Sequence, residues 1–440
     1  MTEFARPLFL TSRTFVLLIL LISFGAGFFK VLDRPHAALF QPRPIGKTGG
    51  GEPHFESRFV SGGETPQTHA ASLVELRDGR LRAFWFAGSR EGAQDVEIHT
   101  AAFVPWRGDW HRESPAATRA GTQKSLKRYI RKLGNPVVWR AANGQLWLFY
   151  VTVSVGGWSG SSITMTTSAD DGETWSPARR LITSPFLNLS TLVKGTPFLY
   201  EDGTLGLPVY HEFIGKFGEL LRLDETGAVI DKQRLSSGNH SLQPVVLVQS
   251  DSKAVTLMRY AGGQSPKRVL RVTTEDAGQR WSRPDRTTLS NPDAALSGVV
   301  LADGRMLVVL NNIESGREQL SLVASHDGGV TWKTLIMLED QTGFLEQPLD
   351  RTRYLETTET LARDSDATVP NPAEYARAAS IQMCKGAGCG YEFSYPYLIQ
   401  ARNGEFHLVY TWNRSFIKHV QFNQAWLDQQ LSETENDRVP

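Results

Sequence analysis

Alternating hydrophobic and polar positions divide most of the chain into short β-strands. The stretch "THAASLVELRDGRLRAFWFAG", residues 68–88, holds two apolar runs separated by the pair Asp78-Gly79. The same arrangement recurs in "NPVVWRAANGQLWLFYV" and "SYPYLIQARNGEFHLVYTW", where Asn-Gly pairs separate the runs. Such pairs between apolar runs are a strong short-range signal for a β-hairpin. The pattern therefore predicts an all-β chain built from repeated hairpins.

The turns of these hairpins recur along the chain. They fall at Asp78-Gly79, Asn143-Gly144, Asp202-Gly203, Asp251-Ser252, Asp303-Gly304 and Asn403-Gly404. The first five are roughly 50 to 65 residues apart, which is close to the length of one four-stranded propeller blade. About 100 residues separate the last two, so the spacing predicts an insertion of about a blade's length before the final repeat.

A second motif keeps the same period. The pattern S/T-x-D-x-G-x-x-W occurs three times, at Ser168–Trp175, Thr274–Trp281 and Ser325–Trp332. The Asp can accept hydrogen bonds from nearby backbone N–H groups, the Gly can adopt positive φ, and the Trp can pack between sheets. Over residues 58–425 the chain resembles Asp-box proteins, and specifically the sialidase (neuraminidase) superfamily. This resemblance implies an all-β, six-bladed β-propeller of sialidase type, in which the Asp boxes are structural.

The two ends of the chain differ from the repeats. An apolar run without charge lies between Arg13 and Lys30, and basic residues precede it. Residues 1–34 are therefore expected to be a signal anchor with a transmembrane helix and a cytoplasmic N-terminus. A cleaved signal peptide is the alternative, although no clear A-x-A site follows. Both interpretations export the remainder to the periplasm or the cell exterior. Residues 35–57 are expected to be a linker and residues 426–440 a polar tail.

Cys384 and Cys389 are the only two cysteines of the chain. In an exported protein, this "CKGAGC" stretch predicts a small disulfide loop, and two reduced thiols are the alternative. A metal site is not expected, because two cysteines need further ligands and no His cluster adjoins them.

The charge balance and the absence of cofactor motifs narrow the function. The chain has 47 Lys and Arg against 46 Asp and Glu, which gives no electrostatic footprint for nucleic acid. It contains no P-loop or dinucleotide fingerprint in a suitable context, so no cofactor and no metal are expected.

The family resemblance also implies a site. Sialidases grip a sugar carboxylate with three arginines, because the guanidinium fork pairs bidentately with it. They use a Tyr nucleophile, an activating Glu and an Asp acid/base, outside the usual two-carboxylate scheme. Arg259 in "KAVTLMRY" and Arg317 in "NNIESGREQ" resemble two of the arginines, and Tyr395 in "EFSYPYLIQ" resembles the nucleophile.

Two positions depart from the family pattern. His69 in "THAASLV" stands where the first arginine is expected, and Gln243 in "SLQPVVLVQ" stands where the activating glutamate is expected. A glutamine cannot take a proton from tyrosine as a carboxylate can. The usual sialidase mechanism is therefore in question for this chain.

Other polar residues at strand ends are candidates for the remaining roles. Asp95 is expected to be the acid/base, with Arg90 on the same loop as a substrate-binding residue. His211, after the apolar run "TLGLPVY", and Arg414, after "LVYTWN", are further substrate-binding candidates.

Three functions agree with these residues. The first is a sialidase-like glycoside hydrolase acting on terminal acidic sugars of glycans, in which Arg259 and Arg317 hold the carboxylate and Asp95 protonates the leaving oxygen. The second is a polysaccharide lyase on uronate-containing glycans, with His69 as base and Tyr395 as acid. The third is a non-catalytic glycan-binding propeller. The expected partners are an acidic carbohydrate and a membrane, the latter through the N-terminal segment.

Overall fold

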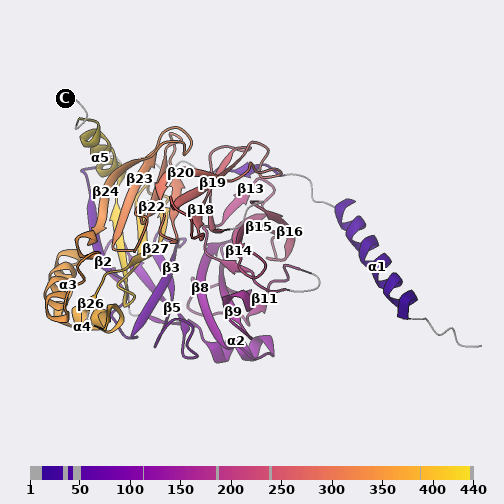
Figure 1. The fold of residues 1–440 in the computed structure, drawn as a ribbon, viewed down its shortest axis with the longest axis horizontal. Helices are drawn as coiled ribbons and strands as arrows, with labels where there is room; N and C mark the ends of the chain where they lie inside the picture. Colours follow the sequence, from indigo (N-terminus) through magenta and orange to yellow (C-terminus); the bar gives the residue numbers. More distant parts are fainter. Residues whose placement is uncertain are drawn as a thin grey trace, which may run out of the picture. The chain divides into compact units, whose positions relative to one another are not determined.

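The computed structural model describes residues 12–32, 38–42, 51–111, 113–184, 188–236, 240–386 and 388–436. The chain divides into two compact units, residues 1–37 and 38–440. The first contains one helix, α1 (Ser12–Leu32) (Figure 1). None of the helices in the described part of the chain is long and apolar enough to cross a membrane. The predicted transmembrane anchor is therefore not confirmed.

The second unit is a six-bladed β-propeller made of antiparallel sheets (Figure 1). From the innermost strand outward, blade 1 contains β3 (Gln67–Glu75), β4 (Leu81–Gly88), β5 (Glu97–Val104), β6 (Asp109–Trp110) and β7 (Ser114–Ala117). Blade 2 contains β8 (Lys132–Arg140), β9 (Leu146–Val153), β10 (Ser161–Ser168) and β11 (Arg179–Arg180). Blade 3 contains β12 (Leu192–Val193) and β13 (Phe198–Tyr200), then β14 (Leu205–His211), β15 (Phe217–Leu223) and β16 (Val229–Arg234). A helix, α2 (Arg119–Leu126), follows blade 1, and a 3₁₀ turn, η1 (Trp158–Gly160), joins β9 to β10.

Blades 4 to 6 continue the same order. Blade 4 contains β17 (Ser241–Val248), β18 (Ala254–Tyr260), β19 (Arg268–Thr274) and β20 (Asp285–Ser290). Blade 5 contains β21 (Ser297–Val300), β22 (Met306–Leu310), β23 (Gln319–Ser325) and β24 (Lys333–Asp340). Blade 6 contains β27 (Phe393–Gln400), β28 (Phe406–Trp412) and β29 (Phe416–Phe422). The second strands β4 and β28 are buried along their whole length, because each blade packs against its neighbours on both faces. The outer strand β16 has no fully buried residue.

The N-terminal part of the propeller unit supplies two strands, where a linker was expected. β2 (Phe55–Phe59) pairs with β29 and forms the outermost strand of blade 6, so the last blade is closed by the start of the unit. β1 (Phe40–Gln41) pairs with β13 of blade 3. Phe40 is fully buried, and its ring lies 5.5 Å from that of Phe198. Part of the predicted linker therefore forms strands: Phe40 is buried against blade 3, and the backbone of β2 adds the outermost strand to blade 6.

Four of the innermost strands have a β-bulge near their first residues. The strand register shifts at the same place in β3, β8, β17 and β27. The bulged residues have left-handed backbones: Ala70 (φ 56°), Asn135 (φ 38°), Gln243 (φ 49°) and Tyr395 (φ 55°). A proline follows the last three, which a bulge tolerates because its extra residue leaves the ladder unpaired. Bulges re-aim side chains, and non-glycine residues in this conformation cluster at functional sites.

The Asp boxes adopt the predicted turns between the third and fourth strands. In the first box, Asp170 Oδ1 accepts from Thr174 N at 2.9 Å, and Ser168 Oγ accepts from Gly172 N at 2.8 Å. The φ of Gly172 is 94°, as the turn requires. The Trp175 ring packs edge-on against Phe84 of the neighbouring blade, 5.6 Å away. The boxes are therefore structural links between blades.

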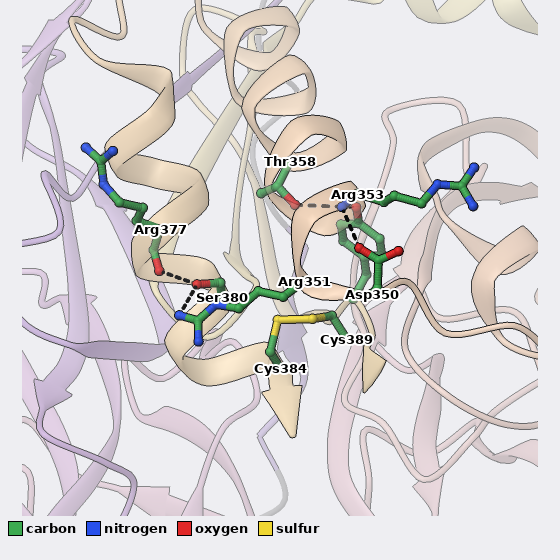
Figure 2. Close-up of a disulfide and its surroundings, with 9 residues drawn as sticks. Asp350, Arg351, Arg353, Thr358, Arg377, Ser380, Cys384 and Cys389 are labelled. Atoms are coloured by element: carbon green, nitrogen blue, oxygen red, sulfur yellow. Dashed lines mark hydrogen bonds between the residues drawn. A yellow bond between two sulfur atoms is a disulfide. The ribbon is translucent and has the colours of Figure 1, made fainter. Parts of the chain in front are cut away.

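The insertion before the last blade is helical. It comprises η2 (Thr342–Phe344), α3 (Arg351–Ser365), α4 (Pro372–Met383) and a hairpin of β25 (Cys384–Lys385) and β26 (Gly388–Cys389). Asp350 caps α3 by accepting from Arg353 N at 3.0 Å. Cys384 and Cys389 form the predicted disulfide, which joins the two strands of the hairpin directly ahead of β27 (Figure 2).

The C-terminal segment is a helix, α5 (Gln424–Asn436), where a polar tail was expected. Asn423 Oδ1 caps it by accepting from Trp426 N at 2.9 Å. Trp426, Leu427 and Leu431 are buried in the core of blades 5 and 6. These three apolar residues at helical spacing explain why the segment packs against the propeller.

Candidate functional site

The bulged residues of several blades meet at one end of the innermost strands. Asn135 Nδ2 donates to the hydroxyl of Tyr210 in β14 at 3.0 Å. Gln243 Nε2 lies 3.4 Å from the hydroxyls of both Tyr210 and Tyr395. Blades 2, 3, 4 and 6 therefore contribute to one cluster, and the bulges direct these side chains into it.

Tyr395 and Arg259 form the centre of this cluster. Arg259 Nη1 lies 3.5 Å from the Tyr395 hydroxyl and donates to Gln243 Oε1 at 3.0 Å. Its Nε donates to Asp293 Oδ1 at 2.5 Å. Burial alone lowers the pKa of Arg259, but Tyr395 and Asp293 outweigh burial and raise it. Arg259 is therefore a fixed cation beside the tyrosine hydroxyl.

Glu392 links the two other arginines of the site. Its Oε1 accepts from Arg317 Nη1 at 3.1 Å, and its Oε2 accepts from Arg414 Nε at 2.6 Å. Arg317 Nη2 also donates to the backbone oxygen of Asp293 at 3.0 Å. Burial raises the pKa of Glu392, but Arg317, His69 and Arg414 outweigh it and lower the value to about 2. The three arginines are thus joined through Asp293 and Glu392.

His69 packs beneath this network. Its ring centroid lies 4.4 Å from that of Tyr395 and 5.5 Å from that of Phe86. The residue is 2% exposed, and its Nδ1 has no hydrogen-bond partner among the described residues. Burial, with Arg414, Arg317 and Lys194 nearby, lowers the pKa of His69 to about 3 despite the opposite effect of Glu392. His69 is therefore a neutral group at neutral pH.

The remaining predicted residues lie outside the cluster. Asp95 is exposed, and its carboxylate accepts from the backbone N and the Oγ of Ser89, both at 2.9 Å. Arg90 is exposed on the same loop. His211 Nε2 accepts from Ile214 N at 3.0 Å, and its ring stacks on Phe217. These contacts hold loops at the ends of β4 and β14.

Three residues of the site were not predicted for it: Glu392, Asp293 and Tyr210. Glu91 lies on the loop from which the acid/base was expected, and its Oε2 lies 3.7 Å from Arg414 Nη1. Burial raises the pKa of Glu212, and Arg259, Asp293 and Glu91 are among the groups that act on it. A proline directly after Asn135, Gln243 and Tyr395 is the sequence signal for the bulges. The acidic residues that pair the arginines carry no such signal.

Two further observations bound the site. Within the described residues, no group of three or more His, Cys, Asp or Glu side chains could hold a metal ion. A cavity of about 430 Å³ lies at the opposite ends of the innermost strands and contains none of the cluster residues. Its lining is uncharged and includes Trp139, Val248 and Gln400.

The six antiparallel sheets and their Asp boxes define a six-bladed β-propeller. A family model described as a BNR repeat-like domain matches residues 79–408. The chain therefore belongs to the BNR repeat-like domain family. A search of the curated proteins found no match.

Solved structures support the fold at low sequence identity. The Hadza microbial sialidase Hz136 is 16% identical, with a TM-score of 0.61 over 84% of this chain and 68% of that chain. The intramolecular trans-sialidase from Ruminococcus gnavus, in complex with oseltamivir carboxylate, is 13% identical, with a TM-score of 0.57 over 84% and 97%. The Trypanosoma rangeli sialidase, in complex with the inhibitor DANA, is 14% identical, with a TM-score of 0.54 over 83% and 56%.

Proposed function

We propose that this chain is a glycoside hydrolase of the sialidase type that acts on terminal sugars carrying a carboxylate. The observation that carries the proposal is the group of three arginines around Tyr395. Arg259 Nη1 lies 3.5 Å from the tyrosine hydroxyl, and the Arg317 guanidinium carbon lies 6.0 Å from the tyrosine ring centre. Arg414 is held to Arg317 through Glu392.

The arginines of the cluster suit a carboxylate-bearing substrate. Their guanidinium groups are held in place by Asp293, Glu392 and Glu91. Guanidinium groups recognise carboxylates through paired hydrogen bonds, which orient the ligand and bind it at once. The relative from Ruminococcus gnavus binds oseltamivir carboxylate, a carboxylate-bearing ligand by its name. A sialic acid or a uronic acid would present the same group.

The position of Tyr395 supports a role at the anomeric carbon of a sugar held in this way. Its left-handed backbone at the bulge directs the side chain toward Arg259 and Gln243. Sialidases use a tyrosine nucleophile where most glycosidases use a carboxylate. We assign Tyr395 this role, with Gln243 as a neutral hydrogen-bonding neighbour.

The acid that protonates the leaving oxygen must come from the rim of the cluster. Asp95 holds this assignment from the sequence, but its carboxylate bonds its own loop at Ser89. Glu91, on the same loop, lies 3.7 Å from Arg414, and burial raises the pKa of Glu212 across the cluster. A raised carboxyl pKa favours the protonated form that a general acid requires. Variants of all three carboxylates belong in the same assay.

The structure favours hydrolysis over elimination. A lyase would need His69 to take a proton from the substrate, but His69 is 2% exposed and packs between Tyr395 and Phe86. A base must reach the proton it abstracts within hydrogen-bond distance. Burial beneath Tyr395 keeps the imidazole from that contact.

We also propose that the propeller works outside the cytoplasm. The disulfide between Cys384 and Cys389 supports this location, because such bonds persist in oxidising compartments. Thiol alkylation of protein from freshly lysed cells, with and without prior reduction, tests it. Labelling without reduction would contradict the proposal.

The activity is tested by incubating the full chain with fluorogenic sialosides, glucuronides and neutral galactosides. We expect release from an acidic glycoside and none from the neutral one, and loss of release in Tyr395→Phe. Mass spectrometry of the product distinguishes hydrolysis, which adds water, from elimination. If no acidic glycoside is turned over but one still binds, the chain is a glycan-binding propeller.

A further inference from the structure

A strongly basic stretch of the sequence lies between blades 1 and 2, and the proposed chemistry does not use it. Glu113 and Asp170 are consecutive acidic residues along the chain, with no Asp or Glu between them. Seven basic residues fall in this interval: Arg119, Lys124, Lys127, Arg128, Arg131, Lys132 and Arg140. The whole chain balances 47 basic residues against 46 acidic ones, so this interval is a local excess of positive charge.

The fold gathers most of these charges around α2. Lys124 is in the last turn of this helix, Lys127 is its C-cap, and Arg128 and Arg131 lie in the segment that leads to β8. All four are exposed. The helix also packs against β11, which contributes Arg180. We call these five residues the basic surface.

The basic surface has no acidic partner among the described residues. The guanidinium groups of Arg131 and Arg180 donate instead to the backbone oxygens of Gly156 and Asn188. Burial lowers the pKa of Arg180, and the positive charge of Arg128 lowers it further. The helix dipole favours cations only in the last turn of α2, so it does not account for these arginines. Like charges held together repel one another, so the surface is suited to an external anion.

The basic surface reaches the rim of the proposed site through Lys132. The Nζ of this lysine lies 3.7 Å from the ring centre of Trp158. A Cβ atom at Gly92 would lie 3.4 Å from the same Nζ, so these two residues are neighbours. Gly92 directly follows Glu91, whose Oε2 lies 3.7 Å from Arg414 Nη1. Figure 1 shows α2 at the same end of the propeller as α4 and β26. A ligand that leaves the site over the Glu91 loop would therefore pass Lys132 before it meets the basic surface.

The helix is fixed to the propeller by groups other than these cations. Thr122 is buried, and its Oγ1 lies 2.9 Å from the hydroxyl of Tyr150 in blade 2. Arg119 Nε donates to the backbone oxygen of Gln94 at 2.7 Å, which ties the start of α2 to the loop between β4 and β5. The exposed side chains of the basic surface are therefore held in place without contributing to these contacts.

Resting on the proposed function, we propose that the basic surface binds further acidic units of a polymeric acidic glycan whose terminal sugar occupies the site around Tyr395. The inference narrows the substrate class to a chain of several carboxylate-bearing sugars. Clustered Lys and Arg side chains attract such a polyanion and raise its local concentration beside the site. Tyr129, which is 55% exposed and adjoins Arg128, offers an aromatic face and a hydroxyl to the same chain.

Titration calorimetry with acidic oligomers tests this inference. The ligands are oligomers of galacturonic acid and of sialic acid, from one to six units, with maltohexaose as the neutral ligand of equal length. Every chain is full length and carries Tyr395→Phe, so that no ligand is consumed. The surface variant adds Lys124→Gln and Arg128→Gln. The control variant adds Arg280→Gln and Arg283→Gln, which remove two exposed arginines at the second Asp box and cause the same change in total charge.

We expect the parent chain to bind an acidic hexamer more tightly than the single sugar acid, and to bind maltohexaose weakest. The surface variant should bind the hexamer roughly 5- to 30-fold more weakly, because two exposed charge contacts are lost. Its affinity for the single sugar acid should equal that of the parent. The control variant should match the parent for both ligands, and circular dichroism checks each fold.

Equal hexamer affinity in the parent and the surface variant would overturn the inference, as would an equal loss in the control variant. A hexamer affinity that falls with salt no more steeply than that of the single sugar acid would overturn it whether or not the surface variant folds. Tighter binding of an oligonucleotide or of phosphatidylglycerol vesicles through Lys124 and Arg128 would replace the glycan with another partner. If the native chain releases no acidic sugar but hexamer binding still depends on these two residues, the proposed function fails and the glycan-binding surface stands.

Discussion

Replacement of Glu392 by glutamine removes the one carboxylate that joins Arg317 and Arg414. The side chain keeps its size, and its amide oxygen can still accept one hydrogen bond. The negative charge is lost, so two partly buried guanidinium groups remain without their shared partner. The variant therefore isolates the electrostatic contribution of this carboxylate to the fold and the site.

The magnitude follows from the pKa of Glu392, which Arg317, His69 and Arg414 lower from an ordinary 4.5 to about 2 against the opposing effect of burial. Each pKa unit corresponds to about 1.4 kcal/mol, so ionised Glu392 contributes about 3 kcal/mol at neutral pH. A depressed carboxyl pKa gives stability that is fully present above pH 4.5 and is lost as pH falls toward 2. Glu392→Gln should therefore unfold about 3 kcal/mol more easily at pH 7, and the difference should be about half of that at pH 3.

Urea unfolding monitored by circular dichroism at pH 7, 5 and 3 measures this difference. Glu318→Gln is the matched control, because burial raises the pKa of that neighbouring carboxyl and its removal should not destabilise the chain at pH 7. If Glu392→Gln stays within 1 kcal/mol of the native chain at pH 7, or if the difference does not change with pH, the reasoning about this network is wrong.

Three further outcomes are expected. Burial lowers the pKa of His69 to about 3, so the folded chain keeps this imidazole neutral while the unfolded chain takes up a proton below pH 6.5. The native chain should therefore lose about 2 kcal/mol of stability from this group between pH 8 and 5, and His69→Phe should lack that loss in parallel urea titrations. Arg317→Ala should weaken the binding of a free sugar acid roughly 10- to 100-fold, because one charge-assisted hydrogen-bonding group is removed. Titration calorimetry measures this affinity, and an unchanged value would exclude Arg317 from the carboxylate site. Removal of the disulfide with Cys384→Ser and Cys389→Ser together should lower the free energy of unfolding by about 2 kcal/mol, which is the loop-closure entropy of so short a ring. Thermal unfolding with and without reductant checks this, because reductant should destabilise the native chain and leave the double variant unchanged.

Hydrophobic periodicity and turn residues predicted most of the fold. The Asx-Gly turns and the Asp boxes mark the blades because local backbone chemistry decides them, and the structure confirms the boxes at Ser168, Thr274 and Ser325. The segments around Phe40 and Phe55 could not be predicted as strands. Their pairing partners lie in blades 3 and 6, far along the chain, and only closure of the ring creates the edges they cover.

The sequence predicted those site residues whose place depends on their position at the start or end of a strand. Tyr395, Arg259 and Gln243 lie at strand starts or ends, and the structure brings them together. Glu392 and Asp293 were missed because their roles depend on which arginines the tertiary fold places beside them. Asp95 was selected for its place after β4, but it bonds Ser89, and Glu91 of the same loop lies near Arg414.

Calorimetric titration of the full chain with a sugar acid and with its methyl ester tests the central claim most directly. The ester replaces the carboxylate that Arg259, Arg317 and Arg414 are proposed to hold with a neutral group that is one methyl larger. Sialic acid and glucuronic acid, each with its ester, cover both substrate classes. Binding of at least one acid, with loss of binding for its ester, is the predicted result. Equal binding of acid and ester, or no binding of either acid, would contradict the account.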